Sequence, residues 1–165
     1  MNIEGIRIYN PVIVGSNYGI KYETPNNISV DLQVHGGHIN SKFCGIVLNN
    51  VQQFSINGVN FYKNSPSYPY VAVYVGVSCR DGGVRDCKFI DTSYSSMFDR
   101  AIYMAGKRCV VSGNSFDHFD EAVLLTYQSG WCSLASNIFF DNTASIEDAG
   151  TTNIIDDSNI LNAGN

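Results

Sequence analysis

Charged residues, tryptophan and proline are all scarce in this chain of 165 residues. Charged side chains make up 15%, and the chain has one tryptophan and four prolines. The net charge of −5 argues against a nucleic-acid partner, which requires a basic face. The first residues lack the basic start and apolar run of a secretory signal peptide. No stretch approaches the roughly 18 consecutive apolar residues of a membrane span, so we also expect no membrane insertion.

Motifs for metals, phosphates and nucleophiles are missing as well. The five cysteines contain no Cys-x-x-Cys pair, and His35-Gly-Gly-His38 spans a predicted corner, where the two imidazoles should diverge. No glycine-rich phosphate loop or nucleophile motif is present. We therefore expect no cofactor and no metal. The cysteines are expected to be reduced and buried as small apolar side chains, with Cys109 and Cys132 stacked on adjacent repeats.

The scarce charge is replaced by neutral polar residues, since the chain has 18 asparagines and 17 serines. Asparagine and serine can stack at equivalent positions of successive repeats without the repulsion that like charges would suffer. The same groups offer hydrogen bonds to hydroxyl-rich ligands such as sugars. Composition alone fits both a structural and a ligand-binding role.

A repeat of apolar residues organises the chain. Six apolar anchors are separated by 22, 28, 27, 23 and 21 residues, namely Ile39, Phe61, Phe89, Phe116, Phe139 and Ile160. A second aliphatic residue stands five positions before each anchor, namely Val34, Ile56, Val84, Val111, Leu134 and Ile155. A flat strand would place residues five apart on opposite faces. The chain must therefore bend between the two for both to reach one core, as at the corner of a β coil.

Each unit also carries a strand that begins with a small residue followed by apolar ones. Examples are Gly45-Ile-Val-Leu48, Ala72-Val-Tyr-Val75, Ala101-Ile-Tyr-Met104 and Ala122-Val-Leu-Leu125, and the series ends with a weaker match, Ala144-Ser-Ile-Glu147. Repeats of roughly 20–30 residues without helical periodicity indicate stacked β coils. A barrel or sandwich would show hairpin spacings of about 8–12 residues, and a leucine-rich repeat would show its Leu/Asn signature. We predict an all-β, right-handed parallel β-helix of about seven coils with 21–28 residues per coil, forming a single domain over residues 1–165.

Three units carry a resemblance to a known superfamily. Ser55-Ile-Asn-Gly-Val-Asn-Phe61, Val84-Arg-Asp-Cys-Lys-Phe89 and Val111-Ser-Gly-Asn-Ser-Phe116 resemble the coils of pectate-lyase-like right-handed β-helices. Within that superfamily, the composition rich in Asn, Ser and Tyr is most similar to bacteriophage tailspike and capsule-depolymerase proteins. The resemblance extends over roughly residues 5–160. It implies a bacterial surface polysaccharide as partner, a homotrimer, and a place in the virion tail after assembly in the host cytoplasm.

The ends of the predicted stack are also informative. Neither end shows an amphipathic helix that could cover the open core, although solenoids normally need caps. We therefore expect the chain to be a segment of a larger protein, or its ends to be covered by subunit contacts.

Two insertions interrupt the repeat at one corner. The distance from an anchor to the next small-apolar strand is five or six residues in three units, but 11 after Phe61 and 12 after Phe89. The insertions Tyr62–Val71 and Ile90–Arg100 should therefore project from the same corner of adjacent coils. Their aromatic rings suit the C–H faces of sugars, although self-packing or a subunit contact would also explain them. We predict substrate-binding roles for Tyr68, Tyr70, Tyr94, Phe98, Arg100, His118, Asp120 and Glu121.

Carboxylates gather at the same corner. Asp91 and Asp141 stand two residues after their anchors, and Asp117 stands one after its own. Stacking places neighbours about 5 Å apart, and glycoside hydrolysis uses two carboxyls about 5–5.5 Å apart for retention or 6.5–9.5 Å apart for inversion. If the chain is an enzyme, we expect a glycoside hydrolase with Asp91, Asp117 and Asp141 as catalytic residues. Turn capping is the alternative explanation of these acids.

Three functions follow from these observations. The first is a tailspike-like module that recognises, and in its enzymatic form cleaves, a bacterial surface polysaccharide. The second is a supporting or oligomerising β-helix without a ligand of its own. The third is a fragment of a secreted bacterial polysaccharide lyase or hydrolase, for which Arg85 and the acids Asp81 and Asp86 would be candidate lyase residues.

Overall fold

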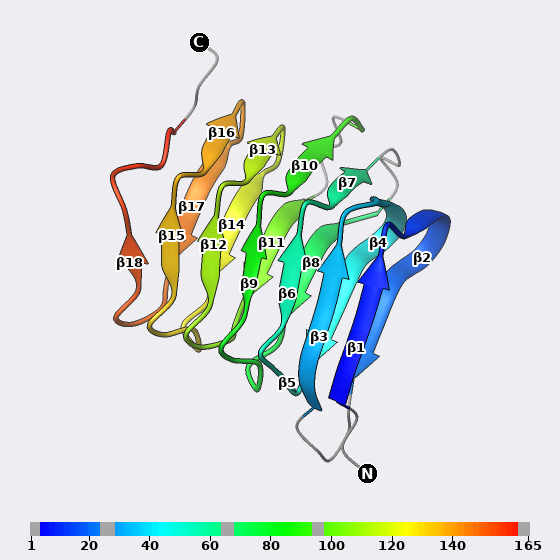
Figure 1. Ribbon diagram of the computed structural model, residues 1–165. Helices are drawn as coiled ribbons and strands as arrows, with labels where there is room; N and C mark the ends of the chain where they lie inside the picture. The colour runs from blue at the N-terminus through cyan, green and yellow to red at the C-terminus, as the bar shows by residue number, and fades with distance from the viewer. Residues whose placement is uncertain (1–3, 24–28, 64–67, 94–97, 162–165) are drawn as a thin grey trace.

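The computed structural model describes residues 4–23, 29–63, 68–93 and 98–161, which form a solenoid of stacked β coils (Figure 1). In Figure 1 the chain rises in front, turns back at the top and descends behind while advancing to the left, so the coil is right-handed. Every strand in it pairs in parallel with its neighbours. The described part of the chain contains no helix, and hence none that is long and apolar enough to cross a membrane. The predicted all-β parallel architecture is confirmed.

Sheet A forms the front of the coil in Figure 1. Its strands stack in the order β1 (Glu4–Tyr9), β3 (Ser29–His35), β6 (Ser55–Asn57), β9 (Gly83–Arg85), β12 (Val110–Ser112), β15 (Ser133–Ala135) and β18 (Ile154–Ile155), with β5 (Val51–Gln52) also paired to β3. The aliphatic residues five before the anchors lie in register here, so that Val34 pairs with Ile56 and Ile56 with Val84. Sheet A therefore supplies one wall of the core.

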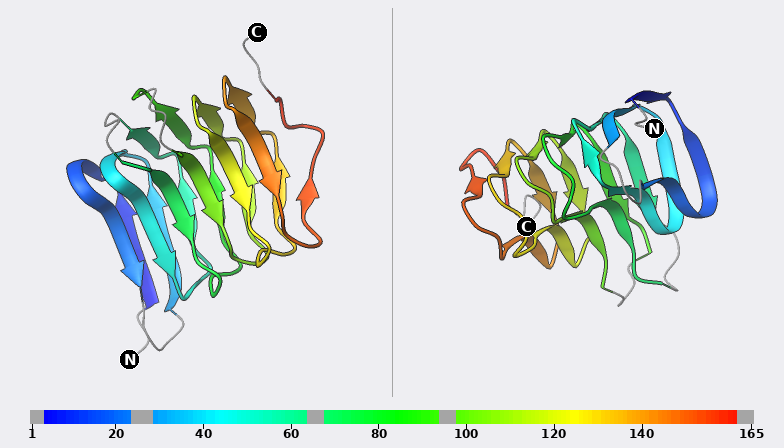
Figure 2. Two further views of the ribbon diagram at one scale, coloured as in Figure 1. Left: turned by 180° about the vertical axis from the view of Figure 1, so that it is seen from behind. Right: turned by 90° about the horizontal axis from the view of Figure 1, so that it is seen from below.

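Sheet B has two branches that meet at β4 (His38–Asn49), which also pairs with β2 (Val12–Glu23). The branch that follows the corner, here called the anchor branch, contains β7 (Asn60–Lys63), β10 (Lys88–Asp91), β13 (Ser115–Asp117) and β16 (Ile138–Phe140). The other, here called the long branch, contains β8 (Val71–Val75), β11 (Arg100–Met104), β14 (Glu121–Leu125) and β17 (Ala144–Asp148). Figure 2 shows the long branch from behind, on the side of the coil opposite sheet A.

The anchors form a ladder of rings in the core. Phe61, Phe89, Phe116 and Phe139 stack with successive centroid separations of 4.9, 4.9 and 4.8 Å. All four are fully buried, as is Ile39. The repeat therefore predicted the core because each anchor packs on the equivalent residue of the next coil.

The last repeat departs from this prediction. Ile155 and Ile160 were expected in the core, but they are 43% and 53% exposed. Of the described residues, only β18 extends sheet A beyond β15, and no further coil covers these two side chains. The stack accordingly has fewer complete coils than the seven expected.

Many of the asparagines have a structural role at the corner between sheet A and the anchor branch. Asn114 accepts the N–H of Cys87 at 2.9 Å and donates to the carbonyl of Val84 at 3.0 Å. Its amide also donates to Asn137, which in turn donates to Asn159 at 2.9 Å. This ladder satisfies buried backbone groups at a sharp corner. It accounts for part of the asparagine content without a ligand.

The five cysteines are free and buried, as the sequence predicted. Cys109 and Cys132 lie on adjacent coils, because the residues that follow them, Val110 and Ser133, pair in register. A hydrogen bond between the two thiols lowers the pKa of Cys132 to about 7, and the same contact raises the pKa of Cys109.

Candidate functional site

A buried ion pair fixes the ends of the two insertions. Lys63 ends β7, Asp99 immediately precedes β11, and their side chains pair with almost no exposure to solvent. Asp99 also accepts the backbone N–H of Tyr70 at 2.7 Å. Its own N–H donates to the carboxylate of Asp120 at 2.9 Å. Asp120, predicted to bind substrate, therefore stabilises the backbone of the coil before it.

Several predicted site residues lie away from solvent. Tyr70 is 0% exposed, so its ring packs in the core and is not available to a ligand in this structure. Asp91 is 2% exposed, and its carboxylate accepts the N–H and the hydroxyl of Ser93 at 2.8 and 2.5 Å. Such a turn is the capping role that aspartate often has. Tyr94 lies outside the described residues.

The predicted pairing of Asp91 with Asp117 does not form. Asp117 lies in register with Ile90, and successive side chains of a strand point to opposite faces. Asp117 instead contacts the imidazole Nδ1 of His118 at 2.6 Å, and the Nε2 of His118 lies 4.0 Å from Asp141. These three residues form a partly exposed row at the corner that ends the anchor branch. The catalytic role of Asp117 and Asp141 stays a prediction.

A more extensive surface lies on the outer side of the long branch, where the strands bring two columns of residues into register. One column contains Cys44, Val71, Arg100, Glu121 and Ala144. The other contains Val47, Tyr74, Tyr103, Leu124 and Glu147. Both columns run parallel to the solenoid axis.

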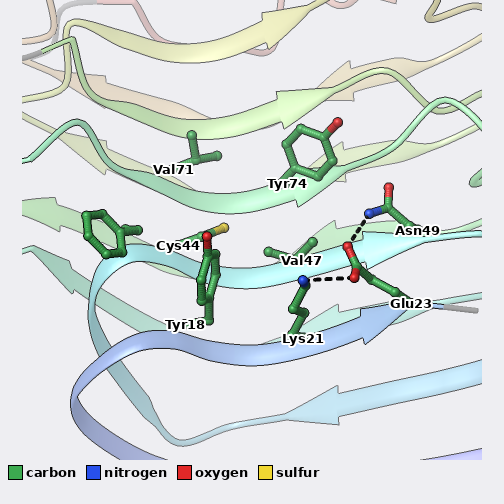
Figure 3. A pocket seen from close by; sticks show the side chains of 9 residues that line it. Tyr18, Lys21, Glu23, Cys44, Val47, Asn49, Val71 and Tyr74 are labelled. Carbon is green, nitrogen blue, oxygen red and sulfur yellow. Dashed lines mark hydrogen bonds and ion pairs between the residues drawn. The ribbon is translucent and has the colours of Figure 1, made fainter.

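A shallow groove of about 330 Å³ occupies the N-terminal half of this surface (Figure 3). Its lining residues are Tyr18, Lys21, Glu23, Phe43, Cys44, Val47, Asn49, Val71 and Tyr74. Aromatic contacts surround it: the ring of Phe43 lies 6.2 Å from Tyr18 and 4.8 Å from Tyr68, which meets it edge-on. Tyr74 stacks on Tyr103 of the next coil at 4.9 Å, with the ring planes 10° apart. The result is a groove with an apolar floor and aromatic walls.

Polar groups close one side of the groove, as Figure 3 shows. Glu23 contacts Lys21 at 2.9 Å and accepts the side-chain amide of Asn49 at 2.7 Å. The hydrogen bond from Lys21 holds the pKa of Glu23 below its ordinary value. Partial burial raises the pKa of Tyr74. Its hydroxyl can donate and accept hydrogen bonds. The groove thus offers aromatic faces beside both donors and acceptors.

The C-terminal half of the same surface is charged. The Nε of Arg100 donates to Glu121 at 2.5 Å, and its guanidinium lies 4.6 Å from the ring centroid of Phe98. A hydrogen bond between Glu147 and Glu121, together with the charge of Glu121, raises the pKa of Glu147. Carboxyl groups in contact, one of them with a raised pKa, are a recurrent arrangement in acid–base catalysis.

Glu147 was not among the predicted site residues, because the last repeat was aligned one residue out of register. The sequence pattern equated Ala144 with Ala122, which would turn Glu147 inward. The structure pairs Ala144 with Glu121 and Glu147 with Leu124, on the outer side. That alignment placed the charged Glu147 at a core position, equivalent to Leu125. A charged residue at a core position was the signal that the alignment of this strand was wrong.

No family model and no curated protein matches the chain. Among solved structures, an alginate lyase from Paenibacillus sp. str. FPU-7 is similar, with a TM-score of 0.74 and 14% sequence identity. The match covers 92% of this chain and 57% of that structure, so the chain spans little more than half of its length. At this identity the likeness shows the fold alone, a parallel β-helix, which is the fold that the repeats predicted.

Proposed function

We propose that the chain is a polysaccharide-binding β-helix whose ligand lies along the outer side of the long branch. The observation that carries this proposal is the aromatic groove and its continuity with Arg100, Glu121 and Glu147. Successive coils repeat at about 4.8 Å, so equivalent side chains recur along the axis. A linear polymer can contact several of them at once.

The groove has the mixture of groups that sugar rings require. Phe43, Tyr18 and Tyr74 present flat apolar faces to the C–H groups of a sugar. Asn49 and the hydroxyl of Tyr74 add hydrogen bonding at the edge. The volume of about 330 Å³ is near the lower end of ligand sites and fits part of a longer chain.

We assign the ligand to the surface polysaccharides of bacteria, and the chain to the tailspike type of β-helix, on the resemblance of its repeats and composition. This setting implies a homotrimer in a virion tail. The alginate lyase of similar structure supports the proposal in one respect: it is an enzyme with this fold whose name refers to a polysaccharide.

A specific observation favours hydrolysis as a second step of the same function. The carboxyl groups of Glu121 and Glu147 are in contact beside Arg100 on the outer side of the long branch, and this contact raises the pKa of Glu147. Glu147 would act as the general acid that donates a proton to the leaving oxygen. Hydrogen-bonded carboxyls lie closer together than the two catalytic carboxyls of a glycoside hydrolase, so Glu121 would raise the pKa of Glu147 and not act as the second catalytic carboxylate. Glu147 replaces Asp91 in our assignment, because Asp91 is buried and bonded to Ser93.

A glycan array probed with the purified chain, followed by a reducing-end assay on each retained polymer, tests the proposal. We expect selective retention of one class of bacterial polysaccharide and weaker retention by Tyr74→Ala. Tyr9→Ala is the matched control, because Tyr9 is an exposed tyrosine on sheet A, where it stacks on His35. If no polymer is retained, or if both variants bind as the wild type does, a supporting β-helix without a ligand is the better description.

A further inference from the structure

The single tryptophan of the chain stands at an unusual place in the fold. Trp131 is 62% exposed and has a φ of 54°, at the corner that leads into β15 of sheet A. Left-handed backbone is uncommon for any residue other than glycine and is unfavourable for a bulky one. The same corner position is occupied on the preceding coils by Arg108 and Asp81, which have the same backbone conformation. A large apolar ring at a strained and exposed position requires an explanation other than core packing.

A hollow of about 500 Å³ lies beside this ring on the outer side of sheet A. It is lined by Arg108, Cys109, Val110, Trp131 and Ser133, and we call it the Trp131 hollow. Its volume falls within the range of small-ligand sites, roughly 300–1,000 Å³. It combines an aromatic face, an arginine and a hydroxyl. Sheet A, which carries the hollow, lies on the side of the coil opposite the long branch (Figures 1 and 2).

The charge around the hollow is opposite to that of the protein as a whole. Arg80 and Lys107 lie on adjacent coils of this corner, in bridge contact, and both are exposed. Arg108 follows Lys107, and Asp81 holds its guanidinium through contacts of 2.6 and 2.7 Å. The carboxylate of Asp148 also lies near, since its charge acts on Cys132. Three cations and two carboxylates thus lie around this corner, an excess of positive charge in a chain whose net charge is −5. An anionic ligand is the complementary one.

From these observations we propose that the Trp131 hollow is a second saccharide-binding site, which takes an acidic sugar residue of the uronate class. The sugar ring stacks on the indole of Trp131, and its carboxylate lies toward the cations of the corner. An aromatic face selects a sugar ring over a simple anion, and the exposed cations select an acidic sugar over a neutral one. This site does not depend on the groove of the long branch, because no residue is shared between the two.

Trp131 is its own reporter, since no other tryptophan contributes to the fluorescence of the chain. We expect hexagalacturonate to change the indole emission saturably and cellohexaose, a neutral chain of equal length, to leave it unchanged. The apparent affinity should fall as salt is raised, because exposed charges are screened. Arg108→Ala retains the reporter and should weaken the interaction by about tenfold. Calorimetry should show a comparable loss for Trp131→Phe.

Control variants separate this site from the proposed groove. Tyr127 lies with Trp131 in the connection between β14 and β15, is more exposed than Trp131, and does not line the hollow. Tyr127→Ala should therefore leave the fluorescence titration with hexagalacturonate unchanged. Tyr74→Ala should also leave the indole signal unchanged, even where it abolishes retention on the glycan array. Loss of the indole signal in Tyr74→Ala would place the sugar in the groove and overturn the proposal. Equal binding of cellohexaose, tighter binding of a single-stranded oligonucleotide, or an unchanged emission with hexagalacturonate would overturn it too.

Discussion

Phe89 and Phe116 stack in the core with their ring centroids 4.9 Å apart and their planes inclined by 9°. Because Phe116 lies between Phe89 and Phe139, its removal leaves a cavity with rings on both sides. We expect Phe116→Ala to lower the free energy of unfolding by about 3–5 kcal/mol, as is typical of buried phenylalanines. Urea denaturation followed by circular dichroism would measure it.

The matched control for that experiment is Ile160→Ala. Ile160 is the anchor that the sequence repeat predicted for the last unit, but it pairs with Ile138, one residue before Phe139, and is 53% exposed. Its truncation should change the free energy of unfolding by no more than about 0.5 kcal/mol. Similar losses at both positions would mean that a further element covers Ile160 and that the core extends to the C-terminal coil.

The pair formed by Lys63 and Asp99 gives a second stability prediction. Both side chains are almost completely buried, so Lys63→Ala leaves a carboxylate in the interior without this partner. Breaking a buried pair in this way costs about 3–5 kcal/mol. Lys21→Ala, which breaks the half-exposed pair with Glu23, should cost at most about 1 kcal/mol. Thermal unfolding of the two variants side by side tests the contrast, and equal losses would show that Lys63 is accessible to water.

The sequence predicted the parts of the fold that depend on regular repetition. The anchors Phe61, Phe89 and Phe116 could be identified because each must pack on the same position of the next coil. The corner insertions were located for the same reason, since they interrupt that spacing. A regular spacing of apolar residues determines which residues stack. The prediction of stacked core residues was correct in every repeat that keeps this spacing.

The direction of individual polar side chains was harder to predict. Asp91 and Asp117 differ by one position in register, and this single step turns one inward and the other outward. Tyr70 looked like a loop residue, but it packs in the core where the insertion returns to β8. Glu147 was missed because one residue of slippage in the last repeat reverses its face. In each case the deciding contact joins residues more than 20 positions apart.

The homotrimer is a prediction that solution measurements can test directly. The first coil exposes Tyr9, Val12 and Val14, and the last exposes Ile154 and Leu161. Exposed apolar groups of this kind at both ends of a solenoid favour contacts that cover them. Light scattering at micromolar concentration should give three times the monomer mass. A monomer would contradict the trimer and favour a segment whose ends are covered by further coils of a larger protein.

The carboxyl pair of Glu121 and Glu147 gives a prediction about pH. The hydrogen bond to Glu121 raises the pKa of Glu147 above its ordinary value of 4.5. A raised pKa means that the folded protein holds this proton more tightly than the unfolded chain does. The stabilisation is therefore complete at pH values below the unfolded pKa and is lost as pH rises through the folded one. Glu121→Gln removes the charge of the partner and should move the pKa of Glu147 back toward 4.5.

Carbon-13 NMR titration of the glutamate carboxyls would measure this shift whether or not the chain is an enzyme. If the chain hydrolyses its polysaccharide, the protonated form of Glu147 is the active one, and turnover should fall as pH rises through its pKa. Glu147→Gln should then lower turnover by at least about 10²-fold, the usual contribution of general acid catalysis, while binding is retained. Asp141→Asn is the control, because Asp141 lies at the corner beside His118 and not on the long branch. A collapse of turnover in Asp141→Asn with normal activity in Glu147→Gln would instead assign the chemistry to the row of Asp117, His118 and Asp141.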